Sequence, residues 1–206
     1  MANDSANYPQ SGRVIAPRDL LEAYASGWFP MGVEPVHGHG IEWFSPNPRG
    51  ILPLTAFRAS SRLKRTVRQA RFAVHVNRNF EGVMRACAAR DETWITEEII
   101  QSYLLLHRLG YAHSVEAWLN DDLAGGLYGV ALRGAFFGES MFHAVTDASK
   151  VALFALVERL TRRGYALLDI QWVTPHLATF GAIEIPRRRY LKLLEGALQL
   201  NCEFTD

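Results

Sequence analysis

Cysteine is almost absent from this chain of 206 residues, which contains only Cys87 and Cys202. Two isolated cysteines form neither a disulfide framework nor the paired spacing of a zinc site. We therefore expect reduced thiols in a cytoplasmic protein. Long apolar runs are also missing, because the longest strongly apolar stretch, residues 151–157, is far shorter than the ~20 residues that span a bilayer. Residues 1–12 are polar, so we expect neither a membrane span nor a signal peptide.

An excess of charge of one sign is absent as well. The formal net charge is +1, so the overall charge does not indicate a nucleic-acid partner. Residues 58–71 are a local exception, with basic side chains and no acidic one. Such a segment is either a solvated helix face or a phosphate-binding surface, and the sequence leaves both open. The basic residues are Arg58, Arg62, Lys64, Arg65, Arg68 and Arg71.

No metal-ligand motif is evident either. His37 and His39 flank a glycine but have no third ligand nearby in the sequence. His113 and His176 have no motif partner, so each is expected to be a structural histidine with satisfied hydrogen bonds. We expect no metal site.

Hydrophobic periodicity and turn residues predict an α+β fold. Helices are expected at residues 17–26, 61–70, 80–89, 97–109, 148–163 and 187–198, with Thr96 as an N-cap. A further short helix is expected after Thr174-Pro175. Strands are expected at residues 72–76, 113–119, 123–132, 135–142 and 166–172. The order indicates a central antiparallel meander followed by a strand–helix–strand unit.

The N-terminal part is less regular. Residues 1–12 are expected to be disordered, and residues 13–60 to form a small N-terminal domain. Residues 27–53 within it are rich in Gly, Pro and Trp, which predicts a compact but irregular segment. Residues 61–206 are expected to form the catalytic domain. Its element order resembles the acetyltransferase-like (GNAT-like) fold, in which the strands before and after the long helix splay apart and form a cleft.

Two polar clusters interrupt the strands on either side of that cleft. One contains Glu139 and Ser140, and the other contains Asp169 and Gln171. A carboxylate in a buried strand is costly unless it is hydrogen-bonded or functional. Strand alternation places Asp169 and Gln171 on the same face. We therefore expect a site in which the two clusters face each other.

Two common chemistries do not fit these residues. The segment Gly138-Glu139-Ser140-Met141-Phe142 has Phe142 where a serine-nucleophile elbow requires glycine. Residues 143–150 contain no glycine, and Asp147 would repel the pyrophosphate that this loop holds in coenzyme A enzymes. We therefore expect no coenzyme A and a different acyl carrier.

A series of short motifs along the chain is more specific. In order, they are Gly27-Trp28-Phe29-Pro30, Trp43-Phe44-Ser45-Pro46-Asn47-Pro48-Arg49, Trp94-Ile95-Thr96, Gly110-Tyr111-Ala112-His113-Ser114-Val115-Glu116, Gly125-Gly126-Leu127-Tyr128-Gly129-Val130, Gly138 to Phe142, Ala148-Ser149-Lys150, Asp169-Ile170-Gln171, Gly181-Ala182 and Ile185-Pro186-Arg187-Arg188. Together they resemble the leucyl/phenylalanyl-tRNA–protein transferases over residues 17–190.

The resemblance implies an aminoacyltransferase. Its members move leucine or phenylalanine from a charged tRNA to the N-terminal Arg or Lys of proteins or peptides, with methionine as a further candidate. The added residue is a degradation signal in the bacterial N-end rule pathway. The missing coenzyme A loop is then explained, because the acyl carrier is aminoacyl-tRNA. We expect a monomer.

The resemblance also implies roles for the two polar clusters. Gln171 Oε1 receives the hydrogen bond of the attacking amine while Asp169 polarises the arrangement. Because an amide is a very weak base, proton transfer through the ribose 2′-hydroxyl remains an equal alternative. Glu139 binds the cationic side chain of the acceptor. The alternative for Glu139 is a salt bridge within the protein, for example to Lys150.

Further positions that match the family bind the donor substrate. The amino-acid pocket comprises Met141, Leu156 and Leu160, although apolar residues at i and i+4 are also typical of a core. Trp94 and Tyr103 are expected near the terminal adenosine. Other residues expected at the tRNA 3′ end or along its backbone are Met31, Ser140, Arg62, Lys64, Arg65 and Arg68.

This chain departs from the family at three of these positions. Met31 stands where a tryptophan is usual, and Leu156 and Leu160 stand where phenylalanines are common. These changes leave the preference between leucine and phenylalanine open. Two other hypotheses are a coenzyme A-dependent acetyltransferase, which the glycine-free loop disfavours, and a non-catalytic module that binds tRNA or basic N-termini.

Overall fold

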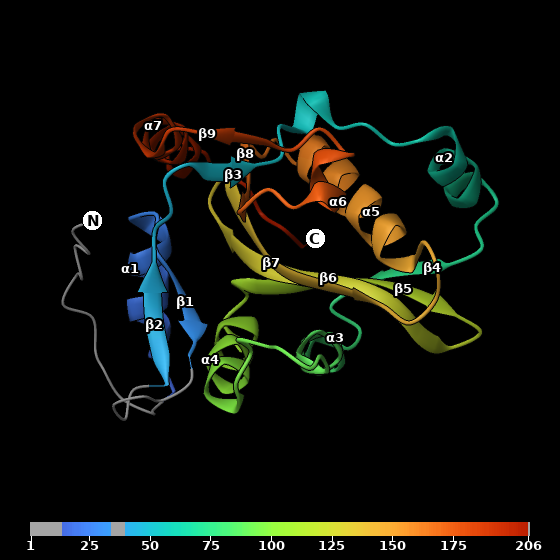
Figure 1. Cartoon of the computed structure of the whole chain (residues 1–206), viewed down its shortest axis with the longest axis horizontal. Helices are drawn as coiled ribbons and strands as arrows, with labels where there is room; N and C mark the ends of the chain where they lie inside the picture. The colour runs from blue at the N-terminus through green and yellow to red at the C-terminus, as the bar shows by residue number, and fades with distance from the viewer. Residues whose placement is uncertain (1–13, 34–39, 206) are drawn as a thin grey trace.

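The computed structural model describes residues 14–33 and 40–205 (Figure 1). The expected disordered segment 1–12 lies outside these ranges, as do His37 and His39. The main sheet contains β4 (Ala73–Val76), β5 (Ala112–Leu119), β6 (Asp122–Leu132), β7 (Ala135–His143), β8 (Leu167–Gln171), β3 (Arg49–Ile51) and β9 (Ile183–Ile185), in this spatial order. Neighbouring strands are antiparallel except β7 and β8, which are parallel. The predicted α+β class and antiparallel meander are confirmed.

Residues 27–53 are more regular than the sequence predicts. β1 (Phe29–Gly32) and β2 (Ile41–Phe44) form a two-stranded antiparallel ribbon. β3 pairs with β8 and β9, whose residues lie more than 100 positions further along the chain. Strands of three or four residues are too short to show a clear alternation of apolar and polar side chains. For β3, the hydrogen-bond partners are also remote in sequence. The expected division at residues 13–60 and 61–206 stays a prediction, with β3 contributing to the main sheet.

Helices cover both faces of the sheet (Figure 1). α3 (Phe80–Ala88) and α4 (Glu97–Arg108) pack on one face, and α5 (Ala148–Arg162) packs on the other beside α2 (Ser61–Arg68). The remaining helices are α1 (Pro17–Ala25), α6 (Pro175–Ala178), α7 (Arg187–Leu198) and a 3₁₀ turn, Leu54–Ala56. Alternating residues of β6 enter two separate cores, with Tyr128 on the α3 and α4 side and Leu127 on the α5 side.

The helix ends follow from local sequence. The predicted N-caps are confirmed, because the Thr96 side chain accepts the Ile99 N–H and the Thr174 side chain accepts the Leu177 N–H. Within the described ranges, none of the helices has both the length and the apolar character that crossing a membrane requires.

The central parallel pair is short, and this creates the site. β7 and β8 are paired only from Ala135 to Phe137 and from Leu167 to Asp169. β7 then continues to His143, and β8 continues to Gln171. The two strands therefore separate beyond Phe137, as expected from the sequence, and a cleft opens in the middle of the sheet.

Candidate active site

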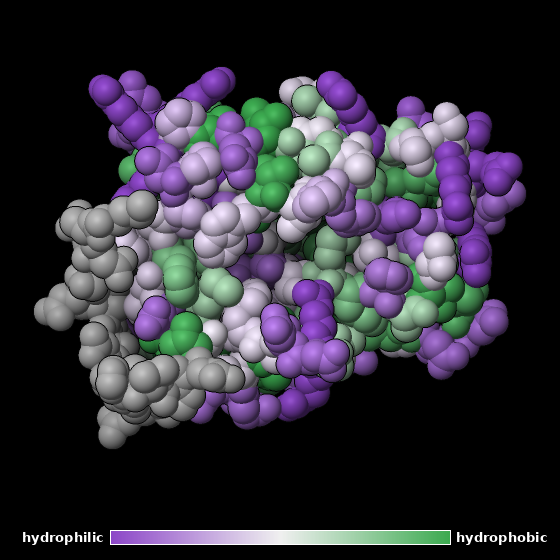
Figure 2. Space-filling view, viewed as in Figure 1, coloured by the Kyte–Doolittle hydropathy of each residue, from purple (hydrophilic) through white to green (hydrophobic). Residues whose placement is uncertain are grey.

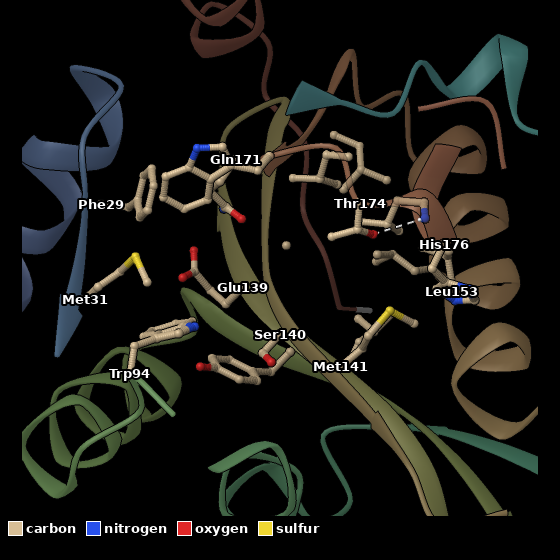
Figure 3. A pocket seen from close by; sticks show the side chains of 18 of the residues that line it. Phe29, Met31, Trp94, Glu139, Ser140, Met141, Leu153, Gln171, Thr174 and His176 are labelled. Atoms are coloured by element: carbon tan, nitrogen blue, oxygen red, sulfur yellow. Dashed lines mark hydrogen bonds between the residues drawn. The ribbon is translucent and has the colours of Figure 1, made fainter. Parts of the chain in front are cut away.

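A cavity of about 290 Å³ opens where β7 and β8 separate (Figure 3). Glu139, Ser140 and Met141 of β7 form one wall, and Gln171 of β8 lies opposite. α5 closes the apolar end of the cavity. The mouth is lined by Phe29, Met31, Trp94 and Trp172. The cavity thus combines aromatic and aliphatic surface with a few convergent polar groups, as ligand sites usually do.

Glu139 enters the cavity because β7 is irregular at this residue. Tyr128 of β6 pairs with Ser140 and Gly129 pairs with Gly138, so Glu139 is an extra residue without a partner on β6. Such a bulge turns a side chain out of the regular alternation, and bulges are common beside active sites. The half-buried carboxyl accepts hydrogen bonds from Tyr24 Oη at 2.7 Å and Tyr103 Oη at 3.2 Å.

The surroundings of Glu139 favour its neutral form. The pKa of the Glu139 carboxyl is raised to about 8, because burial and, to a smaller extent, the charge of Asp169 outweigh the two tyrosine hydrogen bonds and the charge of Arg49, which lower it. Burial and the charge of Glu139 raise the pKa of Tyr24 and of Tyr103 well above the usual value, so both phenols remain donors. Glu139 therefore takes up or releases a proton near neutral pH.

The alternative of a Glu139–Lys150 salt bridge is wrong. Lys150 Nζ lies 2.9 Å from Asp147 Oδ1 instead. Within the described part of the chain, Glu139 has no salt bridge, and its hydrogen-bond donors are the two tyrosines. A cation that enters the cavity therefore does not have to displace a bound lysine or arginine from this carboxyl.

Asp169 lies behind the cavity and is paired with Arg49. Both residues are 0% exposed. Arg49 donates from Nε to Asp169 Oδ1 at 2.9 Å and from Nη2 to Oδ2 at 2.6 Å. Tyr190 Oη adds a third donor to Oδ2 at 2.8 Å. Asp169 does not line the cavity, contrary to the expectation that it shares the substrate-facing side with Gln171.

Gln171 is held in its position by Asp169. The Gln171 N–H donates to Asp169 Oδ1 at 2.9 Å, and the Gln171 backbone has a φ of 58°, which is uncommon for a residue other than glycine. The register shift between β3 and β8 at this point breaks the alternation that the sequence argument assumed. Gln171 Nε2 is buried without a hydrogen-bond partner in the described structure. Leaving this buried amide nitrogen unpaired is costly.

The other expected substrate-binding residues divide into two groups. The cavity lining includes Met31, Trp94, Ser140, Met141 and Leu156. Tyr103 and Leu160 are 0% exposed and lie outside the lining, so neither ring stacking nor side-chain contact with a ligand is available to them here. Tyr103 instead supports Glu139 from behind.

Several lining residues were not identified from the sequence. Leu153, and not Leu160, accompanies Leu156 on the cavity side of α5. Trp172 packs edge-on against Phe29 with ring centroids 5.3 Å apart, and both belong to the mouth. Arg90 lines the cavity in the loop before Trp94. Phe29 occurs in a motif quoted above, but nothing local in the sequence places the other residues in the cavity.

The basic helix α2 lies apart from the cavity lining. The expected tRNA-contacting residues on it are exposed, while Leu63 is buried and fixes the opposite face. These residues are Arg62, Lys64, Arg65 and Arg68. Among the described residues, no group of three or more His, Cys, Asp or Glu side chains is arranged to hold a metal ion.

Fold and site together define a class: an α+β protein whose ligand site lies between two separating strands of one sheet. Comparison with known proteins identifies the family. Its model, described as leucyl/phenylalanyl-tRNA protein transferase, matches residues 51–195, and the model of its N-terminal domain matches residues 14–47. The chain therefore belongs to the leucyl/phenylalanyl-tRNA–protein transferase family.

Individual relatives agree with this assignment. A protein of Gloeobacter violaceus with this name is 54% identical over 190 residues, which cover 92% of this chain and 97% of that protein. One of Rhodopseudomonas palustris strain HaA2 is 57% identical over 189 residues, covering 90% of this chain and 84% of that protein. The solved structure of L-PGS from Bacillus licheniformis aligns with a TM-score of 0.40 and 14% identity over 81% of this chain and 56% of that one. A similarity at this level supports no conclusion about fold or function.

Proposed function

We propose that this chain moves leucine or phenylalanine from aminoacyl-tRNA to the N-terminal Arg or Lys of an acceptor protein. The observation that supports this most directly is Glu139, a carboxyl at the cavity surface that is held by two tyrosines and forms no salt bridge with another described residue. A guanidinium can donate to both oxygens of such a carboxylate, and an ammonium can donate to one. Membership of the leucyl/phenylalanyl-tRNA–protein transferase family supports aminoacyl-tRNA as the donor substrate.

The donor's side chain occupies the apolar end of the cavity in this proposal. The apolar surface there is formed by side chains that are not branched at Cβ, namely Met141, Leu153 and Leu156. A cavity of about 290 Å³ is large enough for a leucine, phenylalanine or methionine side chain together with the ester group. The terminal adenosine then lies towards Trp94 and Met31 at the mouth, where base stacking on an indole is worth roughly 1–3 kcal/mol.

The reaction is the exchange of an ester for an amide. The acceptor's α-amine nitrogen forms a bond to the ester carbonyl carbon, the bond from that carbon to the ribose oxygen breaks, and the ribose oxygen receives a proton. Gln171 orients the amine through its side-chain amide, and the amine proton leaves through Gln171 or the neighbouring ribose hydroxyl. Asp169 fixes Gln171 through the Gln171 N–H and does not touch the substrates, so it is a positioning residue.

The acyl carrier in this proposal is tRNA and not coenzyme A, and no metal takes part. α2 contacts the phosphates of the tRNA body with Arg62, Lys64, Arg65 and Arg68. We also assign the sheet to the acetyltransferase-like architecture, which the separation of β7 and β8 around α5 supports. The protein acts in the cytoplasm as a monomer and creates a degradation signal of the N-end rule type.

The test is transfer of a radiolabelled amino acid to a peptide. Leu-tRNA and Phe-tRNA are each incubated with a peptide that begins with Arg, and the matched peptide begins with Glu. We expect label in the Arg peptide and little in the Glu peptide. Val-tRNA serves as the donor control, because a side chain branched at Cβ should fit the cavity poorly. Absence of transfer from every charged tRNA would refute the proposal.

A further inference from the structure

A second cavity of about 890 Å³ adjoins the first and is not used by the reaction as described so far. It runs between the end of α3, the outer half of β7 and the first turn of α5. Arg90, Met141 and His176 line both cavities, so the two are continuous. We call the second cavity the outer groove. A ligand that fills the first cavity can therefore extend into the outer groove without leaving the protein surface.

The outer groove carries a small excess of positive charge, because its lining holds two permanently cationic side chains, Arg90 and Lys150, against one carboxylate, Asp147. Arg90, His143, Lys150 and His176 lie in its lining, and Asp147 is its single acidic residue. Asp147 forms ion pairs with Lys150, whose Nζ lies at 2.9 Å, and with Arg62, whose Nη2 lies at 3.2 Å, so Arg90 is the cation of this lining that has no acidic partner among the described residues. Burial lowers the pKa of His176, and the charges of Lys150 and His143 lower it further, as expected where cations gather.

Arg90 lies at the junction of the two cavities. Its guanidinium donates to the Met141 carbonyl and, at 3.4 Å, to Ser140 Oγ. Both acceptors are neutral, and Arg90 forms no salt bridge with any described residue. A full positive charge is thus held in a fixed place on the cavity wall that also carries Ser140 and Met141. An arginine in this setting is suited to bind a phosphate.

The far end of the outer groove reaches the basic helix. Arg62 of α2 forms a salt bridge with Asp147, which precedes the first turn of α5. Figure 1 shows α2 beside this end of α5, and Figure 2 shows hydrophilic side chains gathered over α2. The ion pairs of Asp147 with Arg62 and Lys150 therefore connect α2 to the outer groove, and Arg90 lies where the outer groove meets the first cavity.

We propose that the outer groove binds the single-stranded 3′ end of the tRNA and that Arg90 contacts the phosphate of its terminal nucleotide. This assignment rests on the proposed function, because the RNA is the donor of that reaction. An acceptor peptide is the competing occupant. The charge of Arg90 favours RNA, since this guanidinium can pair with a phosphate, whereas a peptide backbone is neutral and a basic N-terminal residue would be repelled by Arg90.

The experiment compares two donors that carry the same amino acid. Phenylalanyl-tRNA has the backbone phosphates, and phenylalanyl-adenosine has none. For Arg90→Ala, we expect kcat/KM to fall at least tenfold more with phenylalanyl-tRNA than with phenylalanyl-adenosine, while KM for the peptide stays within twofold. Arg90→Lys, which keeps the charge, should recover part of the loss. Arg108→Ala, at an exposed arginine at the end of α4, is the matched control and should change neither donor.

Salt dependence provides a second measurement that does not require catalysis. One phosphate contact to a single strand contributes about 0.7 to the slope of log K against log salt concentration. Arg90→Ala should therefore lower the slope of tRNA binding by about 0.7, and Arg108→Ala should leave it unchanged. Equal losses with both donors, an unchanged slope, or a raised KM for the peptide would each overturn the assignment. If the wild type transfers from neither donor, the proposed function fails, and the slope still decides whether RNA occupies the groove.

Discussion

Asp169 and Glu139 lie on neighbouring strands of one sheet, at the point where those strands begin to separate. Asp169 is fully buried and faces a guanidinium that donates to both of its oxygens. Glu139 reaches the cavity and faces two phenols, which donate hydrogen bonds but carry no charge. The first carboxylate has its countercharge within the protein. Among the described residues, the second forms no salt bridge, so it favours the neutral form when free and is suited to a cationic ligand.

Removing the partner of Asp169 should have the largest effect on stability. Arg49→Met leaves a buried carboxylate without its cation, which costs about 3–5 kcal/mol of unfolding free energy. Arg18→Met, which breaks the exposed Arg18–Glu22 pair, is the control and should cause no measurable change. Urea unfolding monitored by circular dichroism measures both.

A double variant separates the pair from its surroundings. Arg49→Met with Asp169→Leu removes both charges, and it should recover most of the lost stability because well-packed apolar groups can replace a buried ion pair. It should not recover transfer, since Gln171 then loses the acceptor for its N–H. Recovery of transfer in this variant would contradict the positioning role of Asp169.

Glu139→Gln should reduce transfer activity with little effect on stability, in contrast to Arg49→Met. The amide resembles the protonated carboxyl in shape, so the variant should fold as the wild type does at neutral pH. A hydrogen bond to a charged group is worth about 1.5–3 kcal/mol, which predicts a loss of roughly 10- to 100-fold in kcat/KM with Arg and Lys acceptors. Steady-state kinetics with the radiolabelled assay measures this. Equal activity in variant and wild type would remove Glu139 from acceptor binding.

The pH dependence of the unfolding free energy should also distinguish the wild type from Glu139→Gln. Burial raises the folded-state pKa of Glu139 from 4.5 to about 8, so the folded state holds this proton more tightly than the unfolded state. The resulting stabilisation is fully present below about pH 4.5 and is lost as the pH rises through about 8. Thermal melts between pH 5 and 9 should show the wild type losing stability relative to Glu139→Gln. A difference that stays constant over this range would show that the pKa is not raised.

The smallest effect is expected from the tyrosines that support each carboxylate. Tyr24→Phe removes a hydrogen bond that lowers the pKa of Glu139, so the midpoint of the pH profile for transfer should move upwards. Tyr190→Phe removes the equivalent donor to Asp169 and should leave that midpoint in place. Each should cost about 0.5–1.5 kcal/mol of stability. The acceptor amine titrates equally in both variants, so the difference between their profiles reports on Glu139.

Long periodic segments of this fold were predictable because their signals are local. The long helix, the meander and the caps at Thr96 and Thr174 all follow from residues within a few positions of each other. The short strands of residues 27–53 were missed because three or four residues show too little alternation, and because β3 pairs only with partners far along the chain. Leu160, which the family resemblance placed in the pocket, is fully buried outside the cavity lining, because helical spacing with Leu156 gives a face but not which turn of that face meets the cavity.

The sequence by itself determined the family, because the motifs and their order can be read directly from it. It also singled out the polar residues of the candidate site, since a carboxylate in a buried strand is costly unless it is hydrogen-bonded or functional. Only the tertiary structure decided what each of these side chains contacts. The bulge at Glu139 and the register shift before Gln171 change where side chains point, and alternation cannot anticipate either. Arg49 and Asp169 are 120 positions apart, so folding alone brings them together and assigns one carboxylate a countercharge while the other stays available.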